Sequence, residues 1–155
     1  MDINRVTLVG SIKEISNMFT PKNGQPCCWL TILTDIPYQK KDSTTEHDQV
    51  NHRVLTYGKY AQVIKEKAAI DQKIFLEGRL KTKSWVHGNT FYEKGFIVLE
   101  RFKLQTPVKN ESQKSEDYDQ QQDMVDYGPE IEEELKFNDD DDSVLKAYYE
   151  DMYSL

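Results

Sequence analysis

The feature that most constrains the fold of this chain is the order of its apolar patterns. Five stretches alternate apolar and polar residues or are rich in β-branched and aromatic residues, and they lie at 3–12, 27–36, 49–57, 73–85 and 90–104. Side chains alternate across a strand with a period of two, so each stretch predicts a β-strand. Turn residues separate several of them, including the run 20–26 and Gly88-Asn89. We therefore predict an all-β domain over roughly the first hundred residues.

One segment, 59–70, has the period of a helix instead. Tyr60, Val63, Ile64 and Lys67 are spaced i, i+3, i+4 and i+7, and alanine and lysine favour helix. It falls between the third and fourth predicted strands. Five strands with one helix in that position is the order of a five-stranded OB-fold barrel, a small Greek-key fold. The polar stretch 37–48 has no period, and we predict a long loop there.

The charge of the chain is divided unevenly between its two parts. Residues 1–109 hold 17 basic and 11 acidic residues, a net charge of +6, whereas residues 110–155 hold 3 and 16, a net charge of −13. Such a split predicts a body that binds a polyanion and a tail with a separate role. Residues 110–142 contain too few apolar side chains to form a core. We predict an OB-fold domain at 1–107, a disordered acidic linker at 108–142 and a partner-binding tip at 143–155.

Several classes of protein lack support in the sequence. There is no apolar run of 18 residues and no leader pattern at the N-terminus, so we expect a cytoplasmic protein without a membrane contact. Cys27 and Cys28 would face opposite sides of a strand and cannot frame a disulfide scaffold or a metal site. His47, His52 and His87 have no metal-binding spacing, and no catalytic motif is present. We expect no enzyme activity, no catalytic residue, no metal and no cofactor.

The stretch EGRLKTKSW at 77–85 carries the strongest functional signal. On a strand, Arg79, Lys81, Lys83 and Trp85 all point to one face. Three cations can follow several phosphates while the tryptophan stacks on a base. The alternative is an ordinary solvated strand face.

Other segments pair an aromatic ring with cations in the same way. Arg53 and Tyr57 share a face of the third predicted strand, although Tyr57 could instead be a residue at the edge of the core. Tyr38 opens the predicted loop just before Lys40. Trp29 is either a further stacking platform or a core residue.

These motifs, in this order, resemble the bacterial single-stranded DNA-binding protein family over residues 2–104. The resemblance is carried by Asn4-Arg5-Val6, Leu8-Val9-Gly10, Thr20-Pro21, Asn23-Gly24, His52-Arg53-Val54, Tyr57-Gly58-Lys59, Glu77-Gly78-Arg79-Leu80, Thr82 and Trp85. It implies an OB-fold, usually a homotetramer, that wraps single-stranded DNA without sequence preference. It also implies that the family's base-stacking aromatics correspond to Tyr38, Tyr57 and Trp85. Asn51 departs from the family, which usually has an aromatic residue there.

The candidate DNA-binding residues combine the residue patterns with this resemblance. They are Arg5, Tyr38, Lys40, Arg53, Tyr57, Lys59, Arg79, Lys81, Lys83 and Trp85. The expected function is binding of single-stranded DNA in replication, recombination and repair. Two alternatives remain open: a primosome-type OB protein that binds DNA as a dimer, and an OB-fold module that binds an acidic protein.

The tail resembles that of the family only in part. Family tails end in an acidic tip with Pro-Phe that binds replication and repair proteins, whereas here the aspartates are followed by SVLKAYYEDMYSL. This difference indicates a divergent member. Helical spacing would gather Leu145, Tyr148, Tyr149 and Met152 into an apolar stripe. We predict that this stripe binds a partner's groove, or else the protein's own barrel or a neighbouring subunit. The candidate partner-binding residues are Asp139, Asp140, Asp141, Asp142, Leu145, Tyr148, Tyr149 and Met152.

Overall fold

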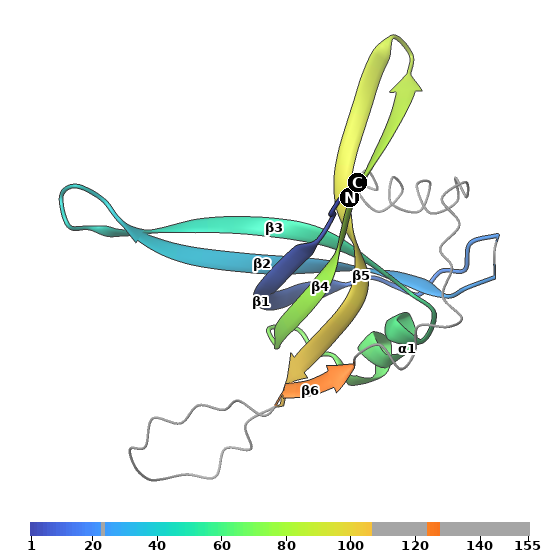
Figure 1. Cartoon of the computed structure of the whole chain (residues 1–155), viewed down its shortest axis with the longest axis horizontal. Coiled ribbons are helices and arrows are strands. Elements are labelled where there is room, and N and C mark those ends of the chain that lie inside the picture. Colours follow the sequence, from blue (N-terminus) through green and yellow to red (C-terminus); the bar gives the residue numbers. More distant parts are fainter. Residues whose placement is uncertain (23, 107–123, 128–155) are drawn as a thin grey trace.

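Strands make up most of the described residues, and the first five follow the predicted order (Figure 1). The computed structural model describes residues 1–22 and 24–106, together with the backbone of 124–127. The elements are β1 (Val6–Ile15), β2 (Cys27–Gln39), β3 (Thr45–Tyr57), α1 (Gly58–Lys67), β4 (Lys73–His87), β5 (Thr90–Gln105) and β6 (Met124–Tyr127). The predicted single helix between the third and fourth strands is confirmed. It begins one residue earlier and ends three residues sooner than the periodicity predicted.

The first five strands close into a barrel, as expected for an OB-fold. The strand order is β3-β2-β1-β4-β5-β6, and neighbours in this order pair antiparallel. A short parallel pairing between β3 and β5 then closes the sheet on itself, with Val54 opposite Ile97 and Leu55 opposite Val98. Closure pairs two strands that would otherwise leave hydrogen-bonding edges exposed.

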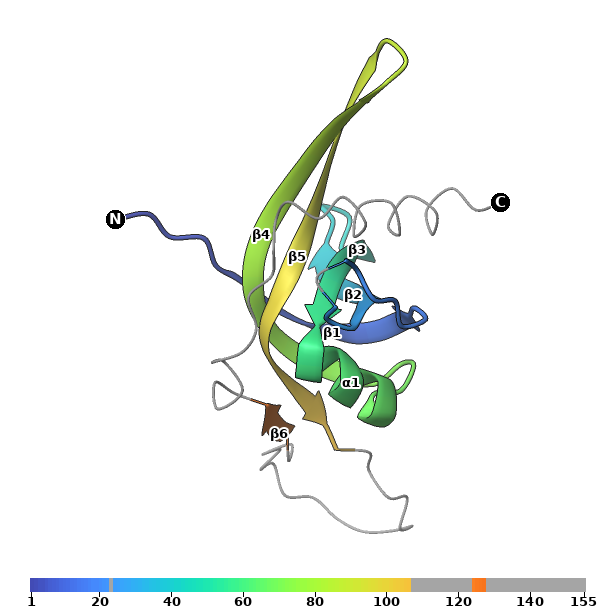
Figure 2. The same cartoon turned by 90° about the vertical axis from the view of Figure 1, so that its right-hand side faces the viewer.

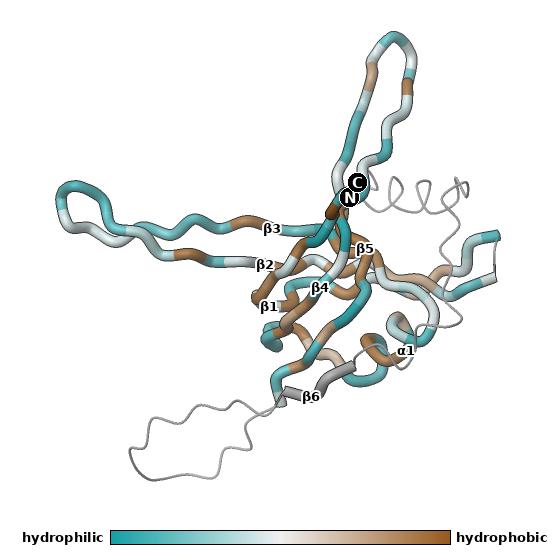
Figure 3. The backbone as a smooth tube through the Cα atoms, in the orientation of Figure 1, coloured by the Kyte–Doolittle hydropathy of each residue, from teal (hydrophilic) through white to brown (hydrophobic). Residues whose placement is uncertain are grey.

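The barrel interior is filled by one side of each strand. Ile12, Leu30, Val54 and Leu76 are all fully buried there, in agreement with a period of two. Helix α1 adds its own apolar side to this core, and the ring of Tyr60 meets Phe102 edge-on at 5.5 Å between centroids. Figure 3 shows that apolar residues gather in the barrel and α1.

Two hairpins extend beyond the barrel, and one of them corrects the sequence prediction. β2 with β3, and β4 with β5, project as separate arms (Figures 1 and 2). The predicted loop at 37–48 is wrong, because most of it belongs to the β2–β3 arm. Cross-strand contacts extend the ladder outward: Nδ1 of His47 lies 2.7 Å from Asp35 Oδ1, and the Tyr38 hydroxyl donates to Glu46 Oε2 at 2.8 Å.

Beyond the barrel, residues Met124–Tyr127 within the predicted linker form strand β6, which pairs with the end of β5. The remainder of the predicted linker and the whole of the predicted tip at 143–155 lie outside the described residues. No helix in the described part of the chain is long and apolar enough to cross a membrane.

Candidate nucleic-acid interface

Strand pairing places the two basic-aromatic segments on one face of the barrel. On β3, Leu55 lies beside Val98 of β5, and Val98 lies opposite Arg79 of β4. Residues paired across strands point to the same side, so the outer face of β3 continues through β5 onto β4. Arg53, two residues before Leu55, therefore shares this face with Arg79. We call this continuous surface the sheet face.

The sheet face continues along the β4–β5 arm. The burial of residues 79–85 alternates as predicted, with Arg79, Lys81, Lys83 and Trp85 partly buried and the residues between them exposed. Opposite the second half of this row, β5 presents Lys94 across from Lys83 and Tyr92 across from Trp85. The arm thus adds a cation and a ring to the predicted set.

Trp85 and Tyr92 form a stacked pair near the end of the arm. Their ring centroids lie 5.6 Å apart and their planes differ by 7°. Each ring restrains the other, and parallel rings at this spacing extend a stack that a base can join. Base–aromatic stacking contributes about 1–3 kcal/mol per base and tolerates every base. The row of cations on β4 therefore ends in a double aromatic platform.

Sequence reasoning missed Tyr92 and Lys94, although a signal was available. The predicted turn at Gly88-Asn89 fixes the register of a two-residue hairpin. Counting outward from that turn places Trp85 opposite Tyr92, and Lys83 opposite Lys94.

The part of the sheet face that lies on the barrel is apolar and buried. Trp29 is 2% exposed and meets Phe96 edge-on, with 5.4 Å between ring centroids and 80° between planes. Trp29 is thus a packing residue, which settles the two alternatives for it. Tyr57 is 7% exposed and belongs to the same cluster. In this arrangement Tyr57 offers little ring surface to a base. Its burial favours the interpretation of Tyr57 as a residue at the edge of the core over that of a stacking residue.

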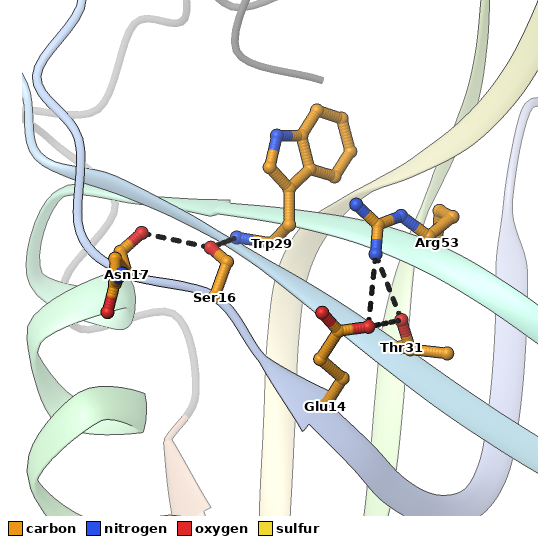
Figure 4. Close-up of polar contacts among 6 residues, drawn as sticks. All are labelled: Glu14, Ser16, Asn17, Trp29, Thr31 and Arg53. Carbon is orange, nitrogen blue, oxygen red and sulfur yellow. Dashed lines mark hydrogen bonds and ion pairs between the residues drawn. The ribbon is translucent and has the colours of Figure 1, made fainter. Parts of the chain in front are cut away.

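Arg53 lies at the border of this cluster and is held on several sides (Figure 4). Its Nη1 donates to Thr31 Oγ1 at 3.0 Å and lies 3.7 Å from Glu14 Oε2. Its guanidinium carbon lies 5.5 Å from the centroid of the Trp29 ring. These contacts fix the direction of the guanidinium, and the nearby carboxylate partly offsets its charge. Arg53 therefore contributes a positioned cation rather than a mobile one.

The remaining predicted residues lie outside β3, β4 and β5 or at the outer end of an arm. Tyr38 and Lys40 lie at the outer end of the β2–β3 arm, where the Lys40 ammonium and the Tyr38 hydroxyl both bind Glu46. The hydrogen bond to Glu46 raises the pKa of the Tyr38 hydroxyl, and the Lys40 contact lowers the pKa of Glu46. Tyr38 is 45% exposed, so its ring is accessible. Lys59, in the first turn of α1, and Arg5, just before β1, are both exposed.

The two cysteines are free and buried. Cys28 points into the barrel and its sulfur lies 2.9 Å from Thr56 Oγ1, while Cys27 belongs to the cluster on the outer side. The prediction that the two thiols face opposite sides is confirmed. Burial raises the pKa of the Cys28 thiol. Among the described residues, no group of three or more histidine, cysteine or acidic side chains is placed to hold a metal ion.

Comparison with known proteins adds a family and a set of similar folds. The sequence model of the Single-strand binding protein family matches residues 3–105. The Plasmodium falciparum SSB, solved in complex with ssDNA, is 16% identical with a TM-score of 0.58, and the match covers 64% of this chain and 88% of that one. A wild-type single-stranded DNA-binding protein from Thermus aquaticus is 20% identical with a TM-score of 0.58, covering 68% and 52%.

A third similar structure is the small single-stranded DNA-binding protein from Streptomyces coelicolor. It is 16% identical with a TM-score of 0.54, and the match covers 66% of this chain and 94% of that one. At these identities the structural likeness shows the fold alone. This chain matches only about half of the Thermus aquaticus protein.

Proposed function

This chain belongs to the single-strand binding protein family, and we propose that it binds single-stranded DNA, without catalysis, along its sheet face. The observation that carries the proposal is the row of cations on β4 that ends in the stacked pair of Trp85 and Tyr92. The same face continues onto the barrel beside Arg53. Cations with accessible aromatic rings are the combination that recognises unpaired nucleotides.

The geometry of the arm supports this function over duplex binding. Residues 79 to 85 span about 20 Å at about 3.3 Å per residue, a length over which several phosphates can contact the cations. Stacking on Trp85 requires a base whose flat side is exposed, which a duplex does not provide. A backbone along Arg79, Lys81 and Lys83 with bases turned toward the rings satisfies both requirements.

We further infer a role in DNA replication, recombination and repair, with the chain acting as a homotetramer whose acidic tail recruits protein partners. The tail's net charge of −13 opposite a body of +6 supports a division between a DNA-binding body and a recruiting tail. Within the tail, the proposed contacts are the aspartates at 139–142 and the apolar stripe that begins at Leu145.

The proposal is tested by titrating labelled oligo-dT and a duplex of equal length with the full chain, followed by fluorescence anisotropy. We expect oligo-dT to bind clearly more tightly, since only the single strand offers bases for stacking. Equal affinity for the duplex would show that the cations alone hold DNA and that the rings take no part.

The same titration over a range of salt concentrations tests the cations. Changing Lys81 and Lys83 together to glutamine is expected to flatten the dependence of log K on log salt by about 0.7 for each phosphate that the variant no longer neutralises. Lys13 pairs with Asp71 at 2.6 Å, away from the sheet face, and Lys13→Gln serves as the control. An unchanged slope in the double variant would remove these lysines from the DNA path.

A further inference from the structure

A pocket of about 560 Å³ opens where the two hairpin arms separate. β3 and β5 pair only at two positions, and toward their N-terminal ends each strand leaves the barrel in its own hairpin (Figure 1). The residues of the pocket that matter here are Asn51 and Arg53 from β3, Leu80 from β4, and Lys94, Gly95 and Phe96 from β5. Because Arg53 and Phe96 also belong to the sheet face, a strand bound on that face passes the pocket.

The walls of the pocket are partly apolar and have a fixed shape. Leu80 is 51% exposed and forms one wall, while Phe96 is held by its edge-on contact with Trp29. Gly95 adds no side chain to the pocket, and a Cβ at this position would make an ordinary contact with Leu80 Cδ1 at 3.7 Å. Concave, largely apolar walls with a few polar groups are typical of sites for small flat ligands.

Two polar side chains of the pocket have no partner in the described part of the chain. Neither the Asn51 amide nor the Lys94 ammonium makes a side-chain hydrogen bond or ion pair there, whereas their neighbours are engaged. Arg53 binds Thr31, and His52 Nε2 lies 2.8 Å from Thr34 Oγ1. An amide carries a donor and an acceptor side by side, and an ammonium only donates.

We propose that this pocket takes one base of the bound strand and that Asn51 selects adenine. An asparagine amide pairs with adenine through two adjacent groups, accepting from the N6 amino group and donating to N7. Glu14, whose carboxylate only accepts, lines the same pocket and favours a base that carries an amino group over thymine. Lys94 then binds a neighbouring phosphate. This inference rests on the proposed function. Stacking alone does not distinguish one base from another, and the pocket adds a preference for adenine.

The test compares oligo-dT with an oligo-dT of the same length that carries one central dA. Wild-type chain is expected to bind the dA strand about tenfold more tightly, and Asn51→Ala to lose this preference while binding oligo-dT as before. Gln49→Ala is the matched control, because it removes an amide from the same face of β3 outside the pocket.

The outcomes separate this inference from the function on which it rests. If wild type binds both strands equally, or if Asn51→Ala weakens both by the same factor, the pocket does not read a base and the proposal is overturned, while single-strand binding stands. If neither strand binds, the proposed function itself has failed. Circular dichroism of each variant shows that the barrel is intact.

Discussion

Trp85→Ala is expected to weaken binding of single-stranded DNA by about 1–3 kcal/mol, a loss of roughly 5- to 150-fold in affinity. The substitution removes one ring of the platform and leaves Tyr92 without the neighbour that lies 5.6 Å away. Both residues lie on the β4–β5 arm near its turn, outside the barrel core. The loss should therefore appear in the affinity for oligo-dT and hardly at all in the free energy of unfolding.

Phe91 provides a matched control on the same arm. It lies opposite Val86, on the other side of the hairpin from Trp85 and Tyr92, and is 65% exposed. Phe91→Ala removes a comparable aromatic ring from the same part of the chain, and we expect it to leave oligo-dT binding nearly unchanged. If both variants lose affinity equally, the two sides of the arm are equivalent and the sheet face is not the binding surface. If Trp85→Ala unfolds the barrel, its ring is a core residue.

Gly78→Ala is expected to cause the largest loss of stability, about 3 kcal/mol or more, because overpacking that forces backbone to move is costly. A Cβ at this position would lie 2.2 Å from the carbonyl oxygen of Val98 and 2.9 Å from Ile97 Cγ2. Val98 belongs to the short pairing between β3 and β5 that closes the barrel. Relief of the clash would have to separate β4 from β5 at that point.

Gly95→Ala is the control for stability, since its added Cβ would have only an ordinary contact at 3.7 Å. Urea unfolding of both variants, at one protein concentration, measures the difference. Equal midpoints for Gly78→Ala and the wild-type chain would show that the strands are not as close at Gly78 as the structure places them.

The barrel could be predicted from the sequence because its strands have one side in the core and one in solvent. In β1, Val6 and Leu8 pack against the core while Thr7 and Val9 are exposed, and this alternation is visible in the residues themselves. The helix was predicted for the same reason, with a different period. Where one side of a strand or helix is buried, the spacing of the apolar residues shows which side it is.

The outer parts of the arms could not be predicted in this way. Ile36 and Val50 are exposed on the β2–β3 arm, and no core lies on either side of it, so apolar and polar residues have no reason to alternate. The arm is held instead by its backbone ladder and by cross-strand pairs such as Asp35 with His47. Such pairs can be identified only after the register is known.

The sequence predicted which site residues share a face of one strand, but not which residues of different strands lie together. One strand was enough to place Arg79, Lys81, Lys83 and Trp85 on a common face. The burial of Trp29 and Tyr57 depends on a cluster that also contains Phe96, brought near by the contact between β3 and β5. That contact joins segments about forty residues apart, and no local pattern records it.

Stacking of single-stranded DNA on the β4–β5 arm is tested most directly by tryptophan fluorescence. The chain has two tryptophans, of which Trp29 is 2% exposed and Trp85 lies on the arm. Oligo-dT should quench the fluorescence of the Trp29→Phe variant, in which only Trp85 remains. Quenching should be largely lost in Trp85→Phe. Strong quenching in Trp85→Phe together with none in Trp29→Phe would contradict stacking on the arm, because the bases would then lie on the barrel.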